Sequence, residues 1–190
     1  MNKRLVWNFE IPSGNQLQLP EPSLDITADT HWESRFFWPE KSVIVLSGLD
    51  EYFLELSRYK IKHRLDYYTL LPDTDDNIKK RKDEWVYKPL LKQTTLAVEY
   101  GKKIKLKDDS EFKDQGQTVL VEKEALIYKF ESHPSTKLEL ARLVINQQVF
   151  FTLCIEAPEL SWVEQLTQQI TDETLSLDYV SFLKQQVGLS

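Results

Sequence analysis

Lysine and arginine side chains recur with strand spacing in three successive segments of this chain. In chain order they are Lys60, Lys62 and Arg64, then Lys79 and Arg81, and then Lys88. Because successive side chains of a β-strand point to opposite faces, each set shares one face of its strand. Cations gathered on one sheet face hold the oxygens of phosphates and other anions. The spacing therefore indicates an anion-binding face, with a solvated surface and edge-protecting lysines as the alternative.

Two carboxylates lie on other predicted strands among apolar neighbours. Glu33 shares a strand face with His31 and Arg35, and Glu156 shares one with Cys154. Carboxylates bind hard divalent cations, and such cations bridge to the phosphate oxygens that Lys and Arg also bind. Together with the basic strands, the two Glu side chains predict a metal-and-phosphate site. The alternative for each alone is a solvated carboxylate or an ion pair with a nearby Arg.

The basic segments belong to a chain that is acidic as a whole. Its 190 residues carry a formal net charge of −6. From Arg58 to Lys107 there are fourteen Lys and Arg against seven Asp and Glu, a balance of +7 that leaves −13 for the rest. A net charge can conceal a local anion-binding region of this kind.

Composition excludes several classes of protein. With 41% hydrophobic and 12% aromatic residues, the chain has enough apolar surface for one packed core. The single cysteine, Cys154, excludes a disulfide scaffold and an all-cysteine zinc site. Glycine-rich nucleotide-binding loops and the HExxH motif are absent. No apolar run reaches about 18 residues and no secretory signal is visible, so we expect a cytoplasmic protein without a membrane partner.

Hydrophobic periodicity predicts the elements that position these side chains. Strands are expected at residues 33–38, 60–71, 78–81, 85–88, 96–107, 118–131, 138–146 and 149–156. Helices are expected at residues 47–57, 160–170 and 177–187. Residues 1–30 are expected to be an N-terminal extension with a strand-like start at residues 5–11, and residues 108–116 a charged loop. The last two strands are expected to form a hairpin that turns at Asn146-Gln147-Gln148. Many antiparallel strands with a few helices predict an α+β fold built on a barrel or closed sheet.

Several short motifs, in chain order, resemble those of the CYTH domain, the triphosphate tunnel metalloenzymes. His31-Trp32-Glu33-Ser34-Arg35-Phe36 resembles the family's Glu-x-Glu-x-Lys signature. The later segments that resemble family strands and the closing helix are Asp66-Tyr67-Tyr68, Ile78-Lys79-Lys80-Arg81, Trp85-Val86-Tyr87-Lys88-Pro89, Phe151-Thr152-Leu153-Cys154-Ile155-Glu156 and Asp178-Tyr179-Val180-Ser181-Phe182-Leu183. The resemblance implies one domain at residues 31–190, folded as an antiparallel eight-stranded β-barrel, the triphosphate tunnel, with flanking helices.

The resemblance also implies roles for individual residues. Glu33 and Glu156 match catalytic, metal-binding carboxylates, with Mg²⁺ or Mn²⁺ as the cofactor. The matching phosphate-binding bases are Arg35, Lys79, Arg81 and Lys88, with Lys123 and Arg142 on later strands. Lys62 and Arg64 are assigned to substrate binding from strand parity alone. His31 and Cys154 stand where the family has Glu, which weakens the expected binding of a hard dication; we interpret both as core residues.

These observations lead first to a phosphohydrolase that binds an inorganic or organic triphosphate, or inorganic polyphosphate, in a basic tunnel. The first alternative is a non-catalytic polyphosphate- or nucleotide-binding protein with a degraded metal site. The second is single-stranded nucleic-acid binding with aromatic stacking, which ranks last because the acidic remainder opposes it. The sequence leaves open whether catalysis survives and whether the chain forms a homodimer.

Overall fold

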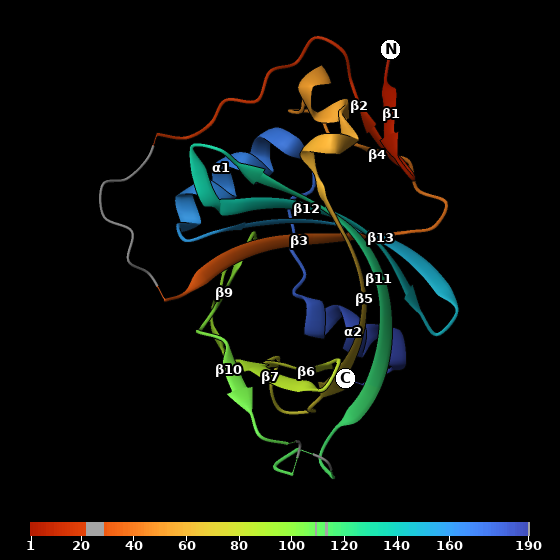
Figure 1. Ribbon diagram of the computed structural model, residues 1–190, viewed down its shortest axis with the longest axis vertical. Coiled ribbons are helices and arrows are strands. Elements are labelled where there is room, and N and C mark those ends of the chain that lie inside the picture. The colour runs from red at the N-terminus through yellow and green to blue at the C-terminus, as the bar shows by residue number, and fades with distance from the viewer. Residues whose placement is uncertain (22–28, 109, 113, 190) are drawn as a thin grey trace.

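A curled, mostly antiparallel sheet of ten strands dominates the described part of the chain (Figure 1). The computed structural model describes residues 1–21, 29–108, 110–112 and 114–189. The sheet's strands are β3 (His31–Pro39), β5 (Lys60–Leu70), β6 (Asn77–Arg81), β7 (Glu84–Lys88), β8 (Leu90–Gln93), β9 (Val98–Tyr100), β10 (Ile104–Leu106), β11 (Gln117–Phe130), β12 (His133–Ile145) and β13 (Gln148–Ala157). They lie in the order β10-β7-β6-β5-β11-β12-β13-β3-β9-β8, and the sheet curves like part of a barrel.

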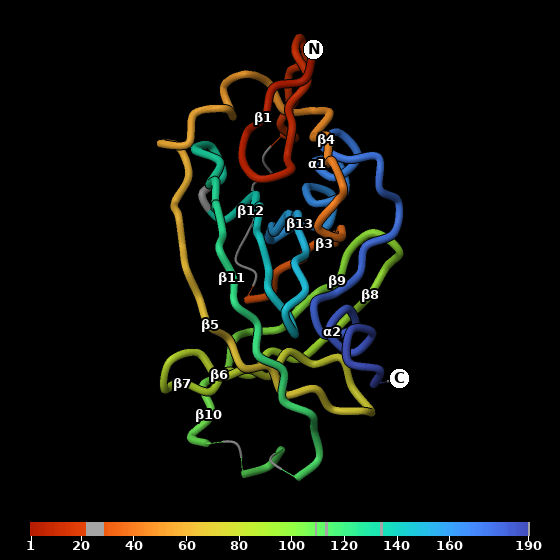
Figure 2. Tube along the Cα trace, turned by 90° about the vertical axis from the view of Figure 1, so that its right-hand side faces the viewer, coloured from red at the N-terminus to blue at the C-terminus, as the bar shows by residue number. Residues whose placement is uncertain are grey.

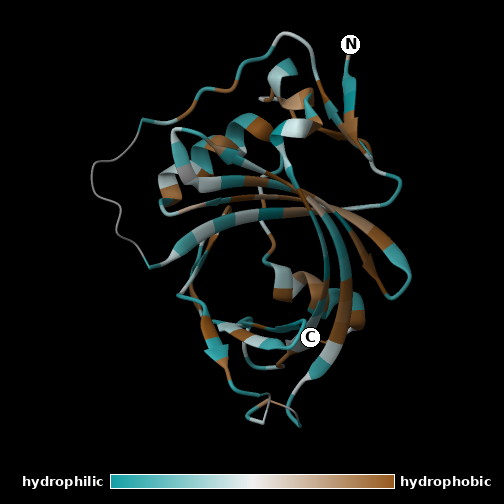
Figure 3. Ribbon diagram, in the orientation of Figure 1, coloured by the Kyte–Doolittle hydropathy of each residue, from teal (hydrophilic) through white to brown (hydrophobic). Residues whose placement is uncertain are grey.

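Three long strands, β11, β12 and β13, form the middle of this sheet as an antiparallel meander. A two-residue turn joins β12 to β13, with φ of 50° at Asn146 and 66° at Gln147. Positive φ at both central residues gives the backbone twist that tight hairpins need. In Figure 3 the hydrophobic colour lies over the strands behind this hairpin turn, while the turn itself is hydrophilic.

The two edges of the sheet are connected through short bends in the chain. Pro89 alone separates β7 from β8, and residues 101–103 separate β9 from β10. β9 pairs with β3, whereas β10 pairs with β7. At the bend the Gly101 amide donates to the Pro89 carbonyl at 2.9 Å. A Cβ at Gly101 would lie 2.8 Å from Pro89 Cγ, so this crossing requires glycine.

The convex face of the sheet carries the larger hydrophobic core. Phe36 from β3 and Leu153 from β13 pack there against α1 (Leu160–Ile170). A small sheet covers the same core, formed by β1 (Lys3–Val6), β2 (Phe9–Ile11) and β4 (Ile44–Val45). Its Phe9 side chain is fully buried. Burial of this apolar surface is the main stabilising contribution of the convex face.

The concave face is packed at one end by α2 (Tyr179–Val187). Asp178 caps this helix by accepting a hydrogen bond from the Ser181 amide at 2.9 Å. Gly188 ends it in the left-handed conformation, with φ of 69°. Phe182 stacks on Phe37 of β3, with ring centroids 3.7 Å apart. Helix α2 therefore anchors one end of the concave face and leaves the remainder to polar side chains.

The expected antiparallel β-rich fold with helices is confirmed at this coarse level. Both C-terminal helices are present, but residues 47–57 form two short 3-10 turns, η1 (Glu51–Leu54) and η2 (Leu56–Arg58), instead of the expected helix. The N-terminal strand-like pattern becomes the β1–β2 hairpin. Residues 22–28 of the expected extension and residues 109 and 113 of the expected loop lie outside the described residues. No helix among the described residues has the length and apolarity to cross a membrane.

Candidate functional site

Strand register brings most of the expected site residues to the concave face. Across the β3–β13 ladder Glu33 lies opposite Glu156, and across the β5–β11 ladder Arg64 lies opposite Lys123. These and the other concave residues line two cavities. The sequence-predicted residues that line them are Glu33, Arg35, Lys62, Arg64, Lys79, Arg81, Lys88, Lys123 and Glu156.

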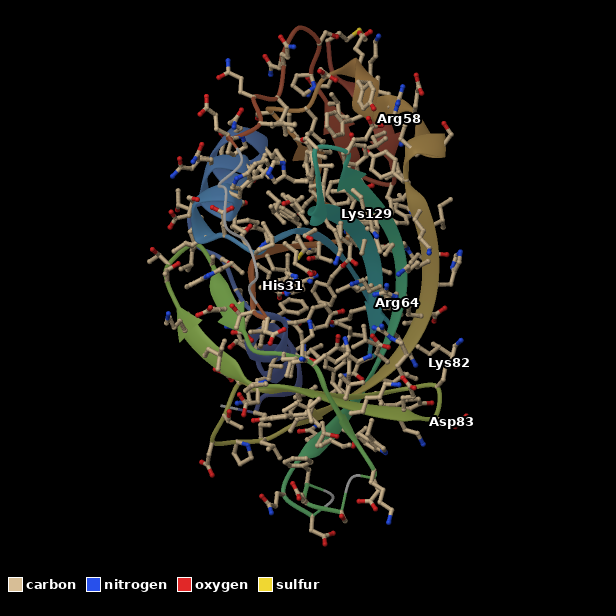
Figure 4. The ribbon with its side chains drawn as sticks, turned by 60° about the vertical axis from the view of Figure 1, so that its left-hand side comes forward. His31, Arg58, Arg64, Lys82, Asp83 and Lys129 are labelled. Carbon is tan, nitrogen blue, oxygen red and sulfur yellow. The ribbon has the colours of Figure 1, made fainter. Side chains whose placement is uncertain are left out.

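The two cavities are neighbours on the same concave face. The larger has a volume of about 450 Å³ and the smaller about 250 Å³. They share the side chains of Arg35, Arg64, Glu139 and Glu156, which form the wall between them. Figure 4 shows Arg64 on the strand wall formed by β5 and β11, with the Lys82–Asp83 turn below it. A ligand at this wall is therefore reached by groups from both cavities.

Arg35 lies at the centre of the shared wall with only 7% of its surface exposed. Its Nε lies 3.6 Å from Glu33 Oε1, and its Nη1 lies 3.5 Å from Glu139 Oε1. Neither nitrogen makes a hydrogen bond within the described residues. The guanidinium carbon lies 4.9 Å from the centroid of the Tyr179 ring. Buried donors without acceptors are costly, and an oxyanion supplies the missing acceptors.

Glu139 connects Arg35 to a second buried cation. The Lys123 ammonium donates a hydrogen bond to Glu139 and lies 5.6 Å from the Tyr179 ring centroid. Burial raises the pKa of Glu139, but the charges of Lys123 and Arg35 outweigh it and hold that pKa far below its usual range. Burial lowers the pKa of Lys123. With Glu33 beside Arg35, the cluster holds two cations and two carboxylates, so any excess of positive charge comes from the other cations that line the cavities.

A second ion cluster surrounds Asp66 on β5. Arg81 donates to both carboxylate oxygens of Asp66 through Nε and Nη2, and Lys79 Nζ lies 3.7 Å from Oδ2. Lys79 also donates to the Tyr68 hydroxyl at 3.3 Å. Burial lowers the pKa of Lys79 to about 7, with Asp66 offsetting only part of that effect. Lys79 therefore changes charge near neutral pH.

Glu33 and Glu156 supply the site's neighbouring carboxylates on β3 and β13. Glu156 accepts a hydrogen bond from Lys137 at 3.0 Å. Burial raises the pKa of Glu156, but the charges of Lys137 and Lys88 outweigh it and the pKa is lowered. The described residues contain no group of three or more His, Cys, Asp or Glu placed to hold a metal ion. Because Mg²⁺ commonly binds one or two carboxylates plus phosphate oxygens, this pair fits a hard cation that shares a phosphate ligand.

Arg142 is the expected site residue that the fold places elsewhere. It lies opposite Glu124 of β11 and Phe151 of β13, on the convex face. Its Nη1 is 3.9 Å from Glu124 Oε2, and both side chains are about one-third exposed (34% and 38%). The structure therefore separates Arg142 from the nine cavity-lining residues.

The aromatic side chains that base stacking would use, Tyr67, Tyr68, Trp85 and Tyr87, are divided between the two faces of the sheet. Tyr68 lines the larger cavity, with Lys79 Nζ 5.2 Å from its ring centroid. Tyr67 is on the other face, where it lines a separate cavity with Arg64, Arg81 and Lys123. Each of these cavities thus has one of the four rings, whereas stacking of successive bases uses several rings on one surface.

Sequence reasoning missed several groups that line the cavities. Glu139 shares a face of β12 with Lys137, but the flanking Leu138, Leu140 and Ala141 are apolar and drew attention away from it. Tyr179 comes from α2, where helical spacing marks it only as a core residue. Cys154 lines the smaller cavity, and burial raises the pKa of its thiol well above the usual value. His31 lies on β3 opposite Tyr100 of β9, outside the lining of both cavities. The missed cations are Lys82, Lys103, Lys129 and Lys137, while Lys60, which belongs to the expected basic face, lines the smaller cavity.

Neither a scan against protein-family models nor a search of curated proteins finds a match to this chain.

Proposed function

We propose that the concave face binds a linear polyphosphoryl anion, with an inorganic or organic triphosphate as the preferred ligand class. The observation that carries this proposal is Arg35, a buried guanidinium with two unsatisfied nitrogens at the wall between two cation-lined cavities. Phosphoryl oxygens match the planar donor geometry of a guanidinium. A linear anion also reaches both cavities at once, which a single small carboxylate does not.

Positive charge left over from the internal ion pairs supports this ligand class. Arg35, Lys79, Arg81 and Lys123 are each within 4 Å of a carboxylate. Further cations that line the cavities have no ion pair within the described residues; they are Lys60, Lys62, Arg64, Lys82, Lys88, Lys103 and Lys129. Such a surplus attracts a ligand with several negative charges more strongly than one with a single charge.

Our proposal places the chain with the CYTH-like triphosphate tunnels. When β7 and β8 are counted as one bent strand, and β9 and β10 as another, the ten strands reduce to eight. The β9–β10 segment then pairs with β3 through β9 and with β7 through β10. An eight-strand ring of this kind gives the cations a common interior, as the resemblance in the sequence implies.

The second candidate function is metal-dependent hydrolysis of the bound triphosphate. It is favoured by the adjacent carboxylates of Glu33 and Glu156, which would hold Mg²⁺ or Mn²⁺. When bound, such an ion would polarise a phosphoryl oxygen and neutralise developing charge. Arg35 and Lys123 would orient the phosphoryl groups and stabilise their charge. A cavity that binds the anion without turnover is the competing, non-catalytic form of the same proposal.

Calorimetric titration with tripolyphosphate, without metal, tests the binding proposal. We expect the Arg35→Gln variant to bind at least about tenfold more weakly, since hydrogen bonds to charged groups contribute about 1.5–3 kcal/mol. Arg142→Gln is the matched control, because it removes an arginine from the convex face of the same sheet. Equal affinity in wild type and Arg35→Gln, with both proteins folded by circular dichroism, contradicts the proposal.

Phosphate release separates the catalytic form from the non-catalytic form. Wild-type protein is incubated with tripolyphosphate and with nucleoside triphosphates, in the presence of Mg²⁺ or Mn²⁺. A rate that depends on the metal and falls in Glu156→Gln while tripolyphosphate still binds supports hydrolysis. Binding without turnover across this panel assigns the cavity to anion binding alone.

A further inference from the structure

One half of strand β5 has a free backbone edge. All of β5 pairs with β11, from Lys60 opposite Ile127 to Leu70 opposite Gln117. On its other side, β5 pairs with β6 only from Asp66 to Thr69. Residues 60–65 therefore have no neighbouring strand on that side within the described chain. In Figure 2 this part of β5 runs along the outer margin of the molecule with β11 on its inner side.

The side chains along this edge separate into a cationic face and a mixed face. Lys60, Lys62 and Arg64 line the smaller cavity, and none of them forms an ion pair within the described residues. On the other face, Ile61 and Leu65 are 60% and 54% exposed, and His63 lies between them with Nδ1 3.5 Å from Glu124 Oε1. Exposed apolar side chains beside an unpaired strand edge form a surface to which another strand can add.

We propose that the edge formed by residues 60–65 binds an extended acidic segment of a partner protein by β-strand addition. The partner's amides and carbonyls pair with the free edge of β5. Its acidic side chains, at every second position, lie beside Lys60, Lys62 and Arg64. Its apolar side chains, at the positions between, cover Ile61 and Leu65. The recognised chemistry is thus a strand in which Asp or Glu alternates with apolar residues.

Charge complementarity selects this partner over a second copy of the same chain. Pairing two copies through residues 60–65 brings two rows of cations together, and like charges on adjacent strands are destabilising. Lysine on an edge strand is a common protection against such self-pairing. An acidic strand removes the repulsion and also covers the exposed apolar residues. The same cations that prevent edge-to-edge dimers therefore favour an acidic partner.

Binding of a designed peptide to the full chain tests the proposal. The probe is a blocked peptide in which Glu alternates with Val, labelled for fluorescence anisotropy. A peptide of the same composition carrying proline at alternate positions lacks the amides needed for strand pairing. We expect only the first peptide to bind and to slow amide hydrogen exchange in residues 60–65. Alternating Lys and Val is the charge control, and it is expected not to bind.

Substitutions on the chain locate the bound peptide. Lys60→Glu reverses one edge charge, and combining it with Leu65→Asp adds a second unfavourable contact. We expect the double variant to lose about tenfold in affinity, as two surface contacts of this kind are each worth up to about 1 kcal/mol. Leu120→Asp is the matched control, because Leu120 is 44% exposed on the same face but lies opposite Tyr67, outside the edge formed by residues 60–65.

Three outcomes overturn the proposal. The first is absence of binding by the acidic alternating peptide. The second is equal binding of the proline peptide, which shows that charge alone attracts it. The third is that tripolyphosphate displaces the peptide while the amides of residues 60–65 are not protected from hydrogen exchange. That result places the peptide in the cavities and not on the strand edge.

Discussion

The two faces of the curled sheet are built from the same strands but differ in role. The convex face packs a hydrophobic core, and the concave face carries charged side chains that line cavities. On β13, Leu153 points into the fully buried convex core, while the next residue, Cys154, lines the charged cavity. On β3, Phe36 packs in the same core beside Arg35, whose guanidinium faces two carboxylates. One strand thus contributes stabilisation from one side and ligand-binding groups from the other. A shift of the strand pairing by one residue would exchange the core side chains and the ligand-binding side chains.

The convex face must offset the free energy that burying charged groups on the concave face costs. Burial lowers the pKa values of Lys79 and Lys123, which means that folding disfavours their charged forms. Side chains whose pKa values are shifted by burial and by neighbouring charges are common at functional sites. The convex core is apolar, and Leu138, Leu140 and Leu153 within it are fully buried.

The largest expected effect comes from a cavity in the convex core. Leu153→Ala should lower the free energy of unfolding by about 2–5 kcal/mol, because Leu153 is completely buried and its neighbours cannot fill the space. Denaturant unfolding measures the change. Leu120→Ala, on an exposed position of the same face, is the control and should stay within about 0.5 kcal/mol. Comparable losses at both positions would show that the convex core is not the main source of stability.

A smaller effect is expected from the pH dependence of unfolding. The folded-state pKa of Lys79 is about 7, below its unfolded value, so the unfolded chain binds the extra proton between about pH 7 and 10. Because of this group, the free energy of unfolding therefore rises with pH across that window, by up to about 1.4 kcal/mol per pH unit. Unfolding curves of Lys79→Met should lack this slope. Parallel curves for the two proteins would contradict a buried, neutral Lys79.

The same group should make anion binding depend on pH. Protonated Lys79 attracts a phosphoryl group, and its charge is lost as pH rises through about 7. We expect the affinity for tripolyphosphate to fall several-fold more in wild type than in Lys79→Met between pH 6 and pH 8, by about one decade at most. Isothermal titration at each pH measures both proteins, and the ligand's own titration is common to them. Identical pH profiles would remove Lys79 from the binding site.

The smallest effect is expected from the charge pair on the convex face. Arg142→Ala removes a solvent-exposed partner of Glu124 at 3.9 Å and should change stability by no more than about 0.5 kcal/mol. Thermal unfolding at low and high salt measures it. A loss of several kcal/mol would mean that convex charges contribute as much as the buried cavity cluster, and the contrast between the faces would fail.

Strand alternation was enough to predict which side chains share a face where polar and apolar residues alternate strictly. Lys60, Lys62 and Arg64 on β5 are the clearest case, since Ile61 and Leu65 occupy the opposite face. The hairpin at Asn146 and both C-terminal helices also follow from local signals.

Other features depend on tertiary structure that local patterns do not encode. Strand β12 carries apolar side chains on both faces around Glu139 and Arg142, so its alternation alone does not tell which face lines the cavity. Helical spacing assigns Tyr179 to a core without revealing that Arg35 lies over its ring. Residues 47–57 carry an amphipathic pattern, yet the chain there makes only 3-10 turns beneath the small β1–β2–β4 sheet.

The pairing of β3 with β13 sets an order for folding during protein synthesis. Hairpins such as β5–β6 and β12–β13 join neighbouring segments, so they can form soon after they leave the ribosome. Strand β3 must wait for β13, which is synthesised long afterwards. Until then Phe36 and its convex neighbours are exposed to chaperones and to other nascent chains. Assembly of the ligand-binding face is consequently among the last events of folding, because Arg35 reaches Glu139 only when β3 has docked.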